Sequence, residues 1–373
     1  MPAVKILHCS DLHIGANESF LEERSAARRM EGLMTFERIV DIALEKGVQV
    51  VLICGDLFDS NRIENLFFDR VMEKVSSAQD ITFVYSAGNH DPLNFESPFL
   101  KAKLPKNFKV FPTTDSVFQL NESLKIYGRS FSEILQNGEE KFGIEADLQT
   151  VNIMCIHGEY GFGGQQNPIS NEFVISSGMD YIALGHVHKR TEPKKAGNTY
   201  IAYSGCPEGL GFDEPGEKGV YIGEIDKNRC DLTFVPTCKR MHEVVKIDVS
   251  GLETNAGIFE KILSTLKENF GDSFGDNLYK IVLTGEIDEA VSINTAEITE
   301  RLSQLTYFVK LRDKTSLKFD LEQIKNEMSL KGVFVANMLR RIEEEPDNAE
   351  KLRSALKIGL KAFSGEVDLL ENQ

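Results

Sequence analysis

The sequence lacks any hydrophobic run that approaches the roughly 20 residues a helix needs to cross a bilayer. Its first residues, MPAVKILHCSDLH, also lack the long apolar core followed by small residues that is typical of a secretory signal peptide. These two absences argue against a membrane-spanning or exported protein. We therefore expect a cytoplasmic protein that does not bind a membrane.

Cysteines are few, and none of them is paired in a CxxC motif. The six cysteines are dispersed over 373 residues. A disulfide framework is typical of short, cysteine-dense secreted chains, and a thiolate zinc site needs closely spaced cysteines. Neither is expected here, and the thiols are expected to be reduced.

Basic residues are also in deficit. The chain has 42 lysines and arginines against 58 aspartates and glutamates, which gives a formal net charge of −16 at pH 7. That balance argues against a protein that binds nucleic acid through bulk positive charge. Local basic clusters do occur at residues 24–29, 101–109 and 188–195. Such clusters lie on a solvated surface more often than along a phosphate backbone.

What is present points to an α/β domain and a second domain. A chain of 373 residues exceeds the size at which one hydrophobic core usually stops growing. Short β-like runs at residues 4–13, 48–59 and 81–91 alternate with helical stretches, the first ending near Lys46 and the second covering residues 62–79. This βαβαβ order predicts an α/β domain with central, buried strands. In such sheets, binding sites form at the carboxyl ends of the strands.

Five successive strand ends carry side chains that can bind a metal. Seven residues form this set: Asp11, His13, Asp56, Asn89, His157, His186 and His188. Each has an ordinary structural explanation by itself, such as a turn, a helix cap or a buried histidine whose hydrogen bonds are satisfied. Their recurrence at all five strand ends is improbable by chance. Imidazole nitrogen with carboxylate and amide oxygen suits borderline-to-hard divalent metals.

His186 and His188 stand two residues apart in LGHVHKR, directly after an apolar run. On a strand, residues with this spacing point to the same side. By themselves they could equally be buried core histidines or metal ligands. The other four strand ends favour ligands.

The ordered series DLH, GD, GNHD, H and GHVH over residues 8–188 resembles the signature of the calcineurin-like metallophosphoesterase superfamily. The resemblance implies an α/β protein with a β-sandwich flanked by helices (α/β/β/α), a smaller α+β capping domain and C-terminal helices. Within the superfamily, YSGCPEGLGFDE at residues 203–214 resembles a segment of bacterial SbcD-type DNA-repair nucleases. Asp59 departs from the archaeal and eukaryotic pattern, which has histidine there, and this leaves the substrate geometry open.

The resemblance also implies roles for individual residues. One metal ion would be held by Asp11, His13, Asp56 and His188, and the other by Asp56, Asn89, His157 and His186. The bridging residue must be a carboxylate because a bridge needs two oxygens. The two cations, which we expect to be Mn²⁺, would neutralise a phosphodiester, orient it and activate the attacking water.

His90 follows a metal ligand and is not expected to be one itself. We expect it to face the substrate, where it would stabilise the phosphoryl oxygens or protonate the leaving oxygen. Asp91 could orient His90, or it could serve only in an Asp-Pro turn.

Cys9, Cys54 and Cys155 each stand two residues before an expected ligand. Alternation along a strand puts each thiol on the ligand's side, one pleat deeper. Metal binding by these thiols is a conceivable alternative. Small buried side chains that pack under the site are the better interpretation.

The character of the sequence changes about two thirds of the way along. We expect a phosphoesterase domain over residues 1–240, an α+β capping domain over 241–320 and C-terminal helices over 321–373. The helices are predicted at 321–344 and 348–362, with an acidic turn between them. Their apolar positions could pack on the cap or dock onto a partner.

We interpret the chain as a two-metal, manganese-dependent phosphodiesterase that acts on DNA, the nuclease subunit of an SbcCD-like complex. Its expected partners are DNA, an SMC-like coiled-coil ATPase of the SbcC type and a second copy of itself in a homodimer. A small-molecule or nucleotide phosphodiesterase or pyrophosphatase is an alternative, although it would not need a cap of about 130 residues. A non-catalytic scaffold is a further alternative, and it predicts a damaged ligand set.

Overall fold

The computed structural model describes residues 3–133, 142–161, 166–227, 229–288 and 291–363. This part of the chain divides into two compact units. Unit one runs to Glu243 and includes Asp276–Leu278, and unit two holds Val244–Gly275 and the chain from Tyr279 onward. Each unit is built around hydrophobic clusters of its own.

The first sheet of unit one has six strands in the order β12-β11-β1-β2-β3-β4. Its strands are β1 (Val4–Cys9), β2 (Val50–Ile53), β3 (Thr82–Tyr85), β4 (Phe108–Val110), β11 (Gly219–Asp226) and β12 (Arg229–Pro236). The neighbours from β1 to β4 are parallel, and β11 and β12 join antiparallel. β2 is buried along its whole length, as expected for a central strand made only of apolar residues.

The second sheet of unit one also has six strands, in the order β5-β6-β7-β8-β10-β9. Its strands are β5 (Ser116–Asn121), β6 (Leu124–Gly128), β7 (Val151–His157), β8 (Tyr181–Gly185), β9 (Lys194–Ala196) and β10 (Thr199–Tyr203). The four inner strands are parallel, and the two edge strands are antiparallel to their neighbours. Every residue of β7 and β8 is buried.

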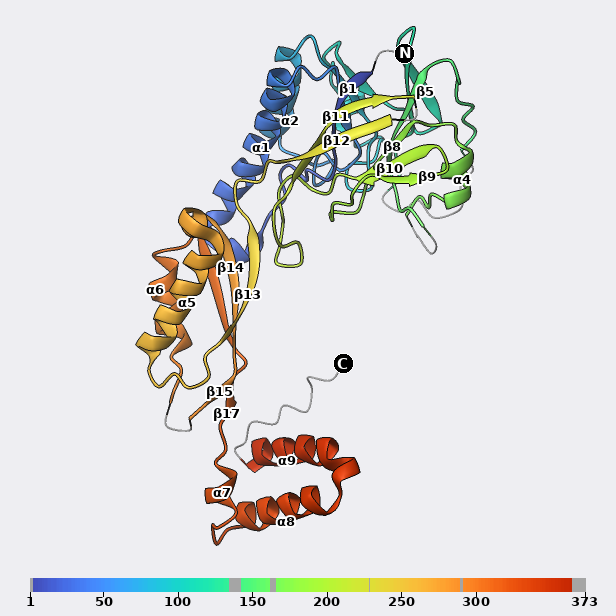
Figure 1. Ribbon diagram of the computed structural model, residues 1–373. Helices are drawn as coiled ribbons and strands as arrows, with labels where there is room; N and C mark the ends of the chain where they lie inside the picture. Colours follow the sequence, from blue (N-terminus) through green and yellow to red (C-terminus); the bar gives the residue numbers. More distant parts are fainter. Residues whose placement is uncertain (1–2, 134–141, 162–165, 228, 289–290, 364–373) are drawn as a thin grey trace. The chain divides into compact units, whose positions relative to one another are not determined.

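The two sheets pack face to face, and helices cover their outer faces (Figure 1). One apolar cluster joins the inner faces, with Leu52 from the first sheet and Ile153 from the second. A second cluster packs α1 (Ser25–Glu45) and α2 (Asn65–Ser77) against the first sheet, and a third packs α4 (Asn171–Ser176) against the second. Two short segments complete the unit: η1 (Ser19–Arg24) and α3 (Pro98–Lys101). The expected α/β/β/α sandwich is confirmed.

α1 buries one face of a long amphipathic helix. Leu33, Phe36, Val40 and Ala43 recur at helical spacing and are fully buried. The helix ends at Glu45, and the nearby Gly47 has a positive φ of 64°, the usual conformation of a glycine that ends a helix. With 21 residues α1 has sufficient length for a bilayer, but its other face is polar. Within the described part of the chain, no helix is both long and apolar enough to span a membrane.

Unit two begins with a three-stranded sheet in the order β13-β14-β16. Its elements are β13 (His242–Asp248), α5 (Asn255–Phe270), η2 (Gly271–Asp276), β14 (Leu278–Thr284), α6 (Thr295–Ser303) and β16 (Phe308–Asp313). Thr254 and Asn294 cap the two helices by accepting hydrogen bonds from backbone N–H groups in the first turns. One apolar cluster joins helices and sheet. β15 (Glu286–Ile287) and β17 (Ser316–Leu317) form a separate parallel pair.

The C-terminal helices of unit two pack on one another. They are α7 (Leu321–Ile324), α8 (Leu330–Glu344), η3 (Pro346–Asn348) and α9 (Ala349–Phe363). The prediction of one continuous helix over residues 321–344 is wrong, because α7 ends at Ile324 and α8 begins at Leu330. Ser329 caps α8 by accepting a hydrogen bond from the N–H of Gly332, and a serine at this position favours a helix start over a helix interior. The helices share an apolar cluster distinct from that of the three-stranded sheet.

Candidate metal centre

The carboxyl ends of the central strands lie at one level in each sheet. Cys9 pairs with Ile53 and Ile53 pairs with Tyr85, so β1, β2 and β3 end side by side. In the second sheet, His157 at the end of β7 pairs with Gly185 at the end of β8. The loops that carry the expected ligands therefore leave the sheets side by side.

The backbone at these strand ends is strained. Among the described residues, six other than glycine have a positive φ, and four of these are expected ligands: Asp11 (52°), His13 (44°), Asp56 (49°) and His186 (96°). Left-handed backbone is unfavourable for residues that have a β-carbon, and such strain clusters at functional sites. Hydrogen bonds hold it in place, because the N–H of Asp11 donates to the carbonyl of Gly55 (3.1 Å) and that of His13 to the carbonyl of Asp56 (2.9 Å).

Two glycines allow the loops to approach closely. A β-carbon at Gly55 would lie 2.1 Å from Nδ1 of His157, and one at Gly88 would lie 2.2 Å from Oδ1 of Asp56. Both distances are far below van der Waals contact, and both neighbours are expected ligands. The glycines of the GD and GNHD motifs are therefore needed for the close approach of the side chains around the site.

Asp11, His13, Asp56 and His188 converge in a first donor set. Nε2 of His13 lies 3.1 Å from Nε2 of His188 and 3.7 Å from Oδ2 of Asp56. Nε2 of His188 lies 3.9 Å from Oδ1 of Asp11. The Ser10 hydroxyl donates to Oδ2 of Asp11 at 2.6 Å and so fixes that carboxylate.

Asp56, Asn89, His157 and His186 converge in a second donor set. Nε2 of His157 lies 3.0 Å from Oδ1 of Asn89 and 3.4 Å from Oδ2 of Asp56. Nδ1 of His186 lies 3.3 Å from the same Asn89 oxygen. The structure thus brings the two histidines of the GHVH motif to different donor sets, and Asp56 belongs to both.

The charges in the two sets depend on one another. Burial lowers the pKa of His13, but the carboxylates of Asp59, Asp56 and Asp11 outweigh burial and raise this pKa to about 9. Burial raises the pKa of Asp56, but nearby imidazoles, led by that of His157, outweigh burial and lower it. The buried carboxylate is thus stabilised in its charged form by positive charge around it, which is also what a divalent ion supplies.

The donor chemistry fits divalent metal ions. Ligand atoms of Asp11, His13 and His188 all lie within 4.8 Å of one another, and so do those of Asp11, Asp56 and His157. Buried acids and imidazoles that face one another this closely are costly without a cation between them. Mixed nitrogen and oxygen donors suit manganese, iron and zinc. They are less suited to metals that prefer thiolate ligands.

Comparison with known proteins gives this arrangement a family. Residues 4–190 match the family model described as calcineurin-like phosphoesterase, a match that covers half of the chain and all five strand ends. The chain belongs to the calcineurin-like phosphoesterase family. Calcineurin-like phosphoesterases depend on bound divalent metals, which agrees with the donor sets of this chain.

Similar proteins align with most of the chain. The uncharacterized metallophosphoesterase YhaO of Bacillus subtilis (strain 168) is 27% identical over 70% of this chain and 67% of its own length. The DNA double-strand break repair protein Mre11 of Sulfolobus acidocaldarius is 24% identical over 82% of this chain and 81% of its own length. The protein of the same name from Methanopyrus kandleri is 25% identical over 87% of this chain and 76% of its own length.

His90 lies at the edge of the phosphoesterase centre. Its ring packs edge-on against that of His13, with 4.6 Å between ring centroids, and its Nδ1 lies 3.1 Å from the carbonyl oxygen of Asp59. A ring nitrogen lies within 4.8 Å of ligand atoms of His13 and Asp56. The side chain is 45% exposed. His90 is therefore close to the donor sets and also accessible from solvent.

Asp91 does not orient His90. Its side chain is fully buried, its Oδ2 accepts the N–H of Phe58 at 2.9 Å, and its Oδ1 accepts the N–H of Gly88 at 3.1 Å. Burial, together with a neighbouring carboxylate, raises the pKa of Asp91. The residue ties the loop after β3 to the loop after β2, which agrees with the structural role left open by the sequence.

The thiols expected under the site are buried there. Cys54 Sγ lies 3.4 Å from Cys155 Sγ, and the thiol of Cys9 donates to the carbonyl of Leu52 at 3.6 Å. Burial raises the pKa of the Cys9 and Cys54 thiols, so they stay protonated. Protonated, buried thiols pack as small apolar side chains and are poor metal ligands.

Three carboxylates beside the donor sets contact ligand histidines that the sequence analysis did not connect with them, although it had noted Asp59 as a departure from the family pattern. They are Asp59, Glu159 and Glu214, which contact His13, His186 and His188 respectively. Two signals were available, because Glu159 follows His157 by two residues and Glu214 ends the segment at residues 203–214. Neither position reveals which imidazole the carboxylate reaches, since that depends on how the loops fold.

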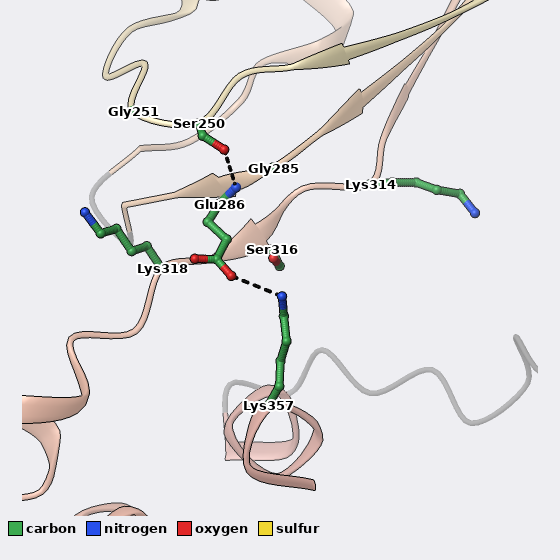
Figure 2. Close-up of a pocket in the computed structure, with 8 residues that line it drawn as sticks. All are labelled: Ser250, Gly251, Gly285, Glu286, Lys314, Ser316, Lys318 and Lys357. Carbon is green, nitrogen blue, oxygen red and sulfur yellow. Dashed lines mark hydrogen bonds and ion pairs between the residues drawn. The ribbon is translucent and has the colours of Figure 1, made fainter. Parts of the chain in front are cut away.

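A pocket in unit two has different chemistry (Figure 2). It has a volume of about 450 Å³ and is lined by Ser250, Gly251, Gly285, Glu286, Lys314, Ser316, Lys318 and Lys357. Nζ of Lys357 pairs with the Glu286 carboxylate at 3.0 Å, as Figure 2 shows. The lining offers three lysines and one carboxylate, so its chemistry differs from that of the two donor sets.

Proposed function

We propose that this phosphoesterase is a two-metal-ion phosphodiesterase that cleaves DNA, in the manner of an SbcD-like exonuclease or endonuclease that processes DNA ends. The observation that carries the proposal is the overlap of two donor sets at Asp56. A carboxylate shared between two sets can bridge two cations, and paired cations are the arrangement used for in-line cleavage of phosphodiesters. Mn²⁺ is the proposed metal, and imidazole together with oxygen donors is compatible with it.

The two sets divide the proposed ligands between the ions. Asp11, His13, Asp56 and His188 would hold one ion, and Asp56, Asn89, His157 and His186 the other. Bound at these residues, divalent ions would supply charge neutralisation for a phosphodiester and activation of the attacking water. Asn89 contributes an oxygen without adding negative charge, which keeps the site attractive to an anionic substrate. The N–H of His186 donates to Asp11 at 3.0 Å, so this carboxylate is positioned by the backbone.

His90 is proposed to act on the phosphate rather than to bind metal. The contact of Nδ1 with the Asp59 carbonyl fixes the imidazole ring while leaving the residue accessible. A histidine placed there can donate a proton to the phosphoryl oxygens or to the leaving oxygen.

The extent of the similarity favours DNA over a small phosphodiester. The family model ends at residue 190, but the alignments with the Mre11 proteins cover 82% and 87% of the chain, more than unit one contains. The similarity therefore reaches into the proposed capping domain at residues 241–320, beyond the proposed nuclease domain at residues 1–240. A small-molecule phosphodiesterase would not need that cap.

The C-terminal segment at residues 321–373 is proposed to dock the SMC-like coiled-coil ATPase. Its residues 364–373 lie outside the described part of the chain. On α8, Leu330 is 76% exposed and Val333 is 57% exposed although both are apolar. Exposed apolar side chains that are close together on one helix are typical of protein–protein contact surfaces.

A homodimer is proposed through unit one. Leu66 on α2 and Leu100 on α3 are both exposed. The two elements are neighbours, because the rings of Phe68 and Phe99 lie 5.6 Å apart between centroids. Exposed leucines on neighbouring elements suit a self-complementary contact.

A metal-dependent assay on three substrates tests the proposed function. Chelator-stripped protein is given Mn²⁺ and then a bis-aryl phosphodiester, an aryl phosphomonoester or end-labelled duplex DNA. We expect diester hydrolysis and DNA cleavage with Mn²⁺ and neither without it. Absence of diester hydrolysis with Mn²⁺ bound would contradict the proposed chemistry, and preference for the monoester would contradict the proposed substrate class.

A further inference from the structure

The segment at residues 203–214 ends beside the metal centre. Its last residue, Glu214, accepts a hydrogen bond from Nδ1 of His188. Nε2 of the same imidazole faces the first donor set, 3.1 Å from Nε2 of His13 and 3.9 Å from Oδ1 of Asp11. His188 thus presents one nitrogen to the donor set and the other to a carboxylate.

Glu214 is itself held in place. Its second oxygen accepts the N–H of Leu210 at 3.0 Å and the thiol of Cys206 at 3.5 Å. The side chain is 16% exposed. Because both oxygens are engaged, the carboxylate cannot turn away from His188 without losing a hydrogen bond in a mostly buried place.

Glu159 has the matching position at the second donor set. Its Oε1 lies 3.0 Å from Nε2 of His186, while Nδ1 of that imidazole faces Oδ1 of Asn89 at 3.3 Å. The carbonyl of Glu159 accepts the N–H of Ile169 at 2.8 Å, which fixes the backbone that carries it. The two histidines of GHVH therefore each have a glutamate of their own.

The remaining two ligand histidines also direct Nδ1 toward an oxygen atom, as a hydrogen bond in His157 and as a longer ion-pair contact in His13. Nδ1 of His157 lies 2.9 Å from the carbonyl oxygen of Cys54, and Nδ1 of His13 lies 3.4 Å from Oδ1 of Asp59. An imidazole whose outer N–H is bonded to a carboxylate is fixed in tautomer and orientation, and its inner nitrogen becomes more basic toward a metal.

We propose that Glu214 and Glu159 are positioning residues of the metal centre, each of which fixes one histidine of the GHVH motif for a different ion. This inference rests on the metal site of the proposed function. Each glutamate acts through its histidine. Loss of Glu214 therefore weakens the ion of the set that contains His13, and loss of Glu159 weakens the ion of the set that contains His157.

Calorimetric titration of chelator-stripped protein with Mn²⁺ separates the two effects. His186→Ala damages the second set and leaves the first, and His13→Ala does the reverse. In the His186→Ala background, Glu214→Ala should lower the affinity for Mn²⁺ by about 10- to 100-fold, and Glu159→Ala should leave it within about twofold. In the His13→Ala background, the two glutamate variants should exchange these effects.

Comparison of Glu214→Gln with Glu214→Ala, together with a control variant elsewhere on the surface, distinguishes a specific effect on the metal from a general loss of structure. Glu214→Gln keeps one oxygen that can accept the His188 N–H, so its affinity should fall less than that of Glu214→Ala. Both variants lose an acceptor for the Leu210 N–H, so both should lower the melting temperature of metal-free protein to a similar extent. Glu192→Ala removes an exposed acid that pairs with Arg190 and should leave the affinity unchanged.

The outcomes distinguish the inference from the proposed function. A wild-type chain that binds no Mn²⁺ would contradict the proposed function itself. A wild-type chain that binds two ions, with glutamate variants that bind them equally tightly or lose both ions alike, would overturn only the inference.

Discussion

Oδ2 of Asp56 lies 3.4 Å from Nε2 of His157, although the two residues come from different sheets of the sandwich. The same carboxylate oxygen lies 3.7 Å from Nε2 of His13. One side chain therefore joins the strand ends of both sheets. Any change at this carboxylate must affect both donor sets, whereas a change at an imidazole affects one.

Asp56→Asn should consequently weaken both metal sites, because the carboxamide supplies one good oxygen donor instead of two. His13→Ala should chiefly empty the first site. Elemental analysis of purified, Mn²⁺-reconstituted protein measures the ions per chain. Retention of two ions by Asp56→Asn would refute the bridge.

His90→Gln tests whether chemistry and metal binding are separate at the edge of the site. If His90 acts on the transition state, turnover of a bis-aryl phosphodiester should fall by roughly 10²–10⁴-fold, the range for general acid–base groups, while both ions remain bound. Metal loss in this variant would make His90 a ligand. Unchanged turnover would remove it from the mechanism.

His8 predicts a pH dependence of stability that is independent of the metal. It is fully buried, with Nδ1 2.7 Å from the Tyr181 hydroxyl and Nε2 3.0 Å from the carbonyl of Leu184. Burial lowers its pKa from 6.5 to about 3. The unfolded chain therefore binds this proton below pH 6.5 while the folded chain does not. Below pH 6.5, the contribution of His8 to the free energy of unfolding should therefore fall by about 1.4 kcal/mol for each pH unit.

Denaturant unfolding of metal-free protein between pH 7 and 5 measures this effect. His8→Asn keeps a polar partner for Tyr181 and cannot titrate, so the variant should lack this part of the slope. Equal slopes in the two proteins would show that His8 does not carry the dependence.

Leu330→Glu combined with Val333→Glu should abolish binding of the coiled-coil ATPase, because it places charge on the exposed apolar face of α8. Hydrolysis of a small phosphodiester should persist. Leu305→Glu, at another exposed leucine of unit two, should leave binding intact. A pull-down and a melting curve measure the outcome, and undiminished binding by the double variant would rule out this face.

The sequence predicted an α/β domain and the meeting of the strand ends because both follow from periodic patterns, whereas the sandwich itself was implied by the family resemblance. Apolar runs mark buried strands, and parallel order brings their carboxyl ends together. The family resemblance added the expectation that Asp56 after β2 and His157 at the end of β7 hold the same ion, although 101 positions separate them in the chain.

Contacts made by loops could not be predicted in this way. Asp91 turned toward two backbone N–H groups instead of His90, because its fully buried carboxylate needs donors that the surrounding loops supply. Glu214 reaches His188 from a segment with no periodic pattern. The break before α8 also depended on a local competition, in which Ser329 capped a new helix.

The acidic composition bears on the DNA substrate. Affinity for DNA comes largely from neutralised phosphates, and the logarithm of the affinity falls with that of salt by about 0.9 per phosphate. A chain with a net charge of −16 offers few such contacts beyond its metals. We therefore expect the isolated protein to bind DNA weakly, with a shallow salt dependence, and the ATPase partner and a second copy to supply the missing contacts.

The most direct test is the rate of Mn²⁺-dependent cleavage of duplex DNA ends, measured over a range of salt with and without the coiled-coil ATPase, beside hydrolysis of a nucleotide diester. We predict slow DNA cleavage by the isolated chain and a large increase when the partner is present. Efficient turnover of the nucleotide diester, with no DNA cleavage even in the presence of partner and Mn²⁺, would contradict the account.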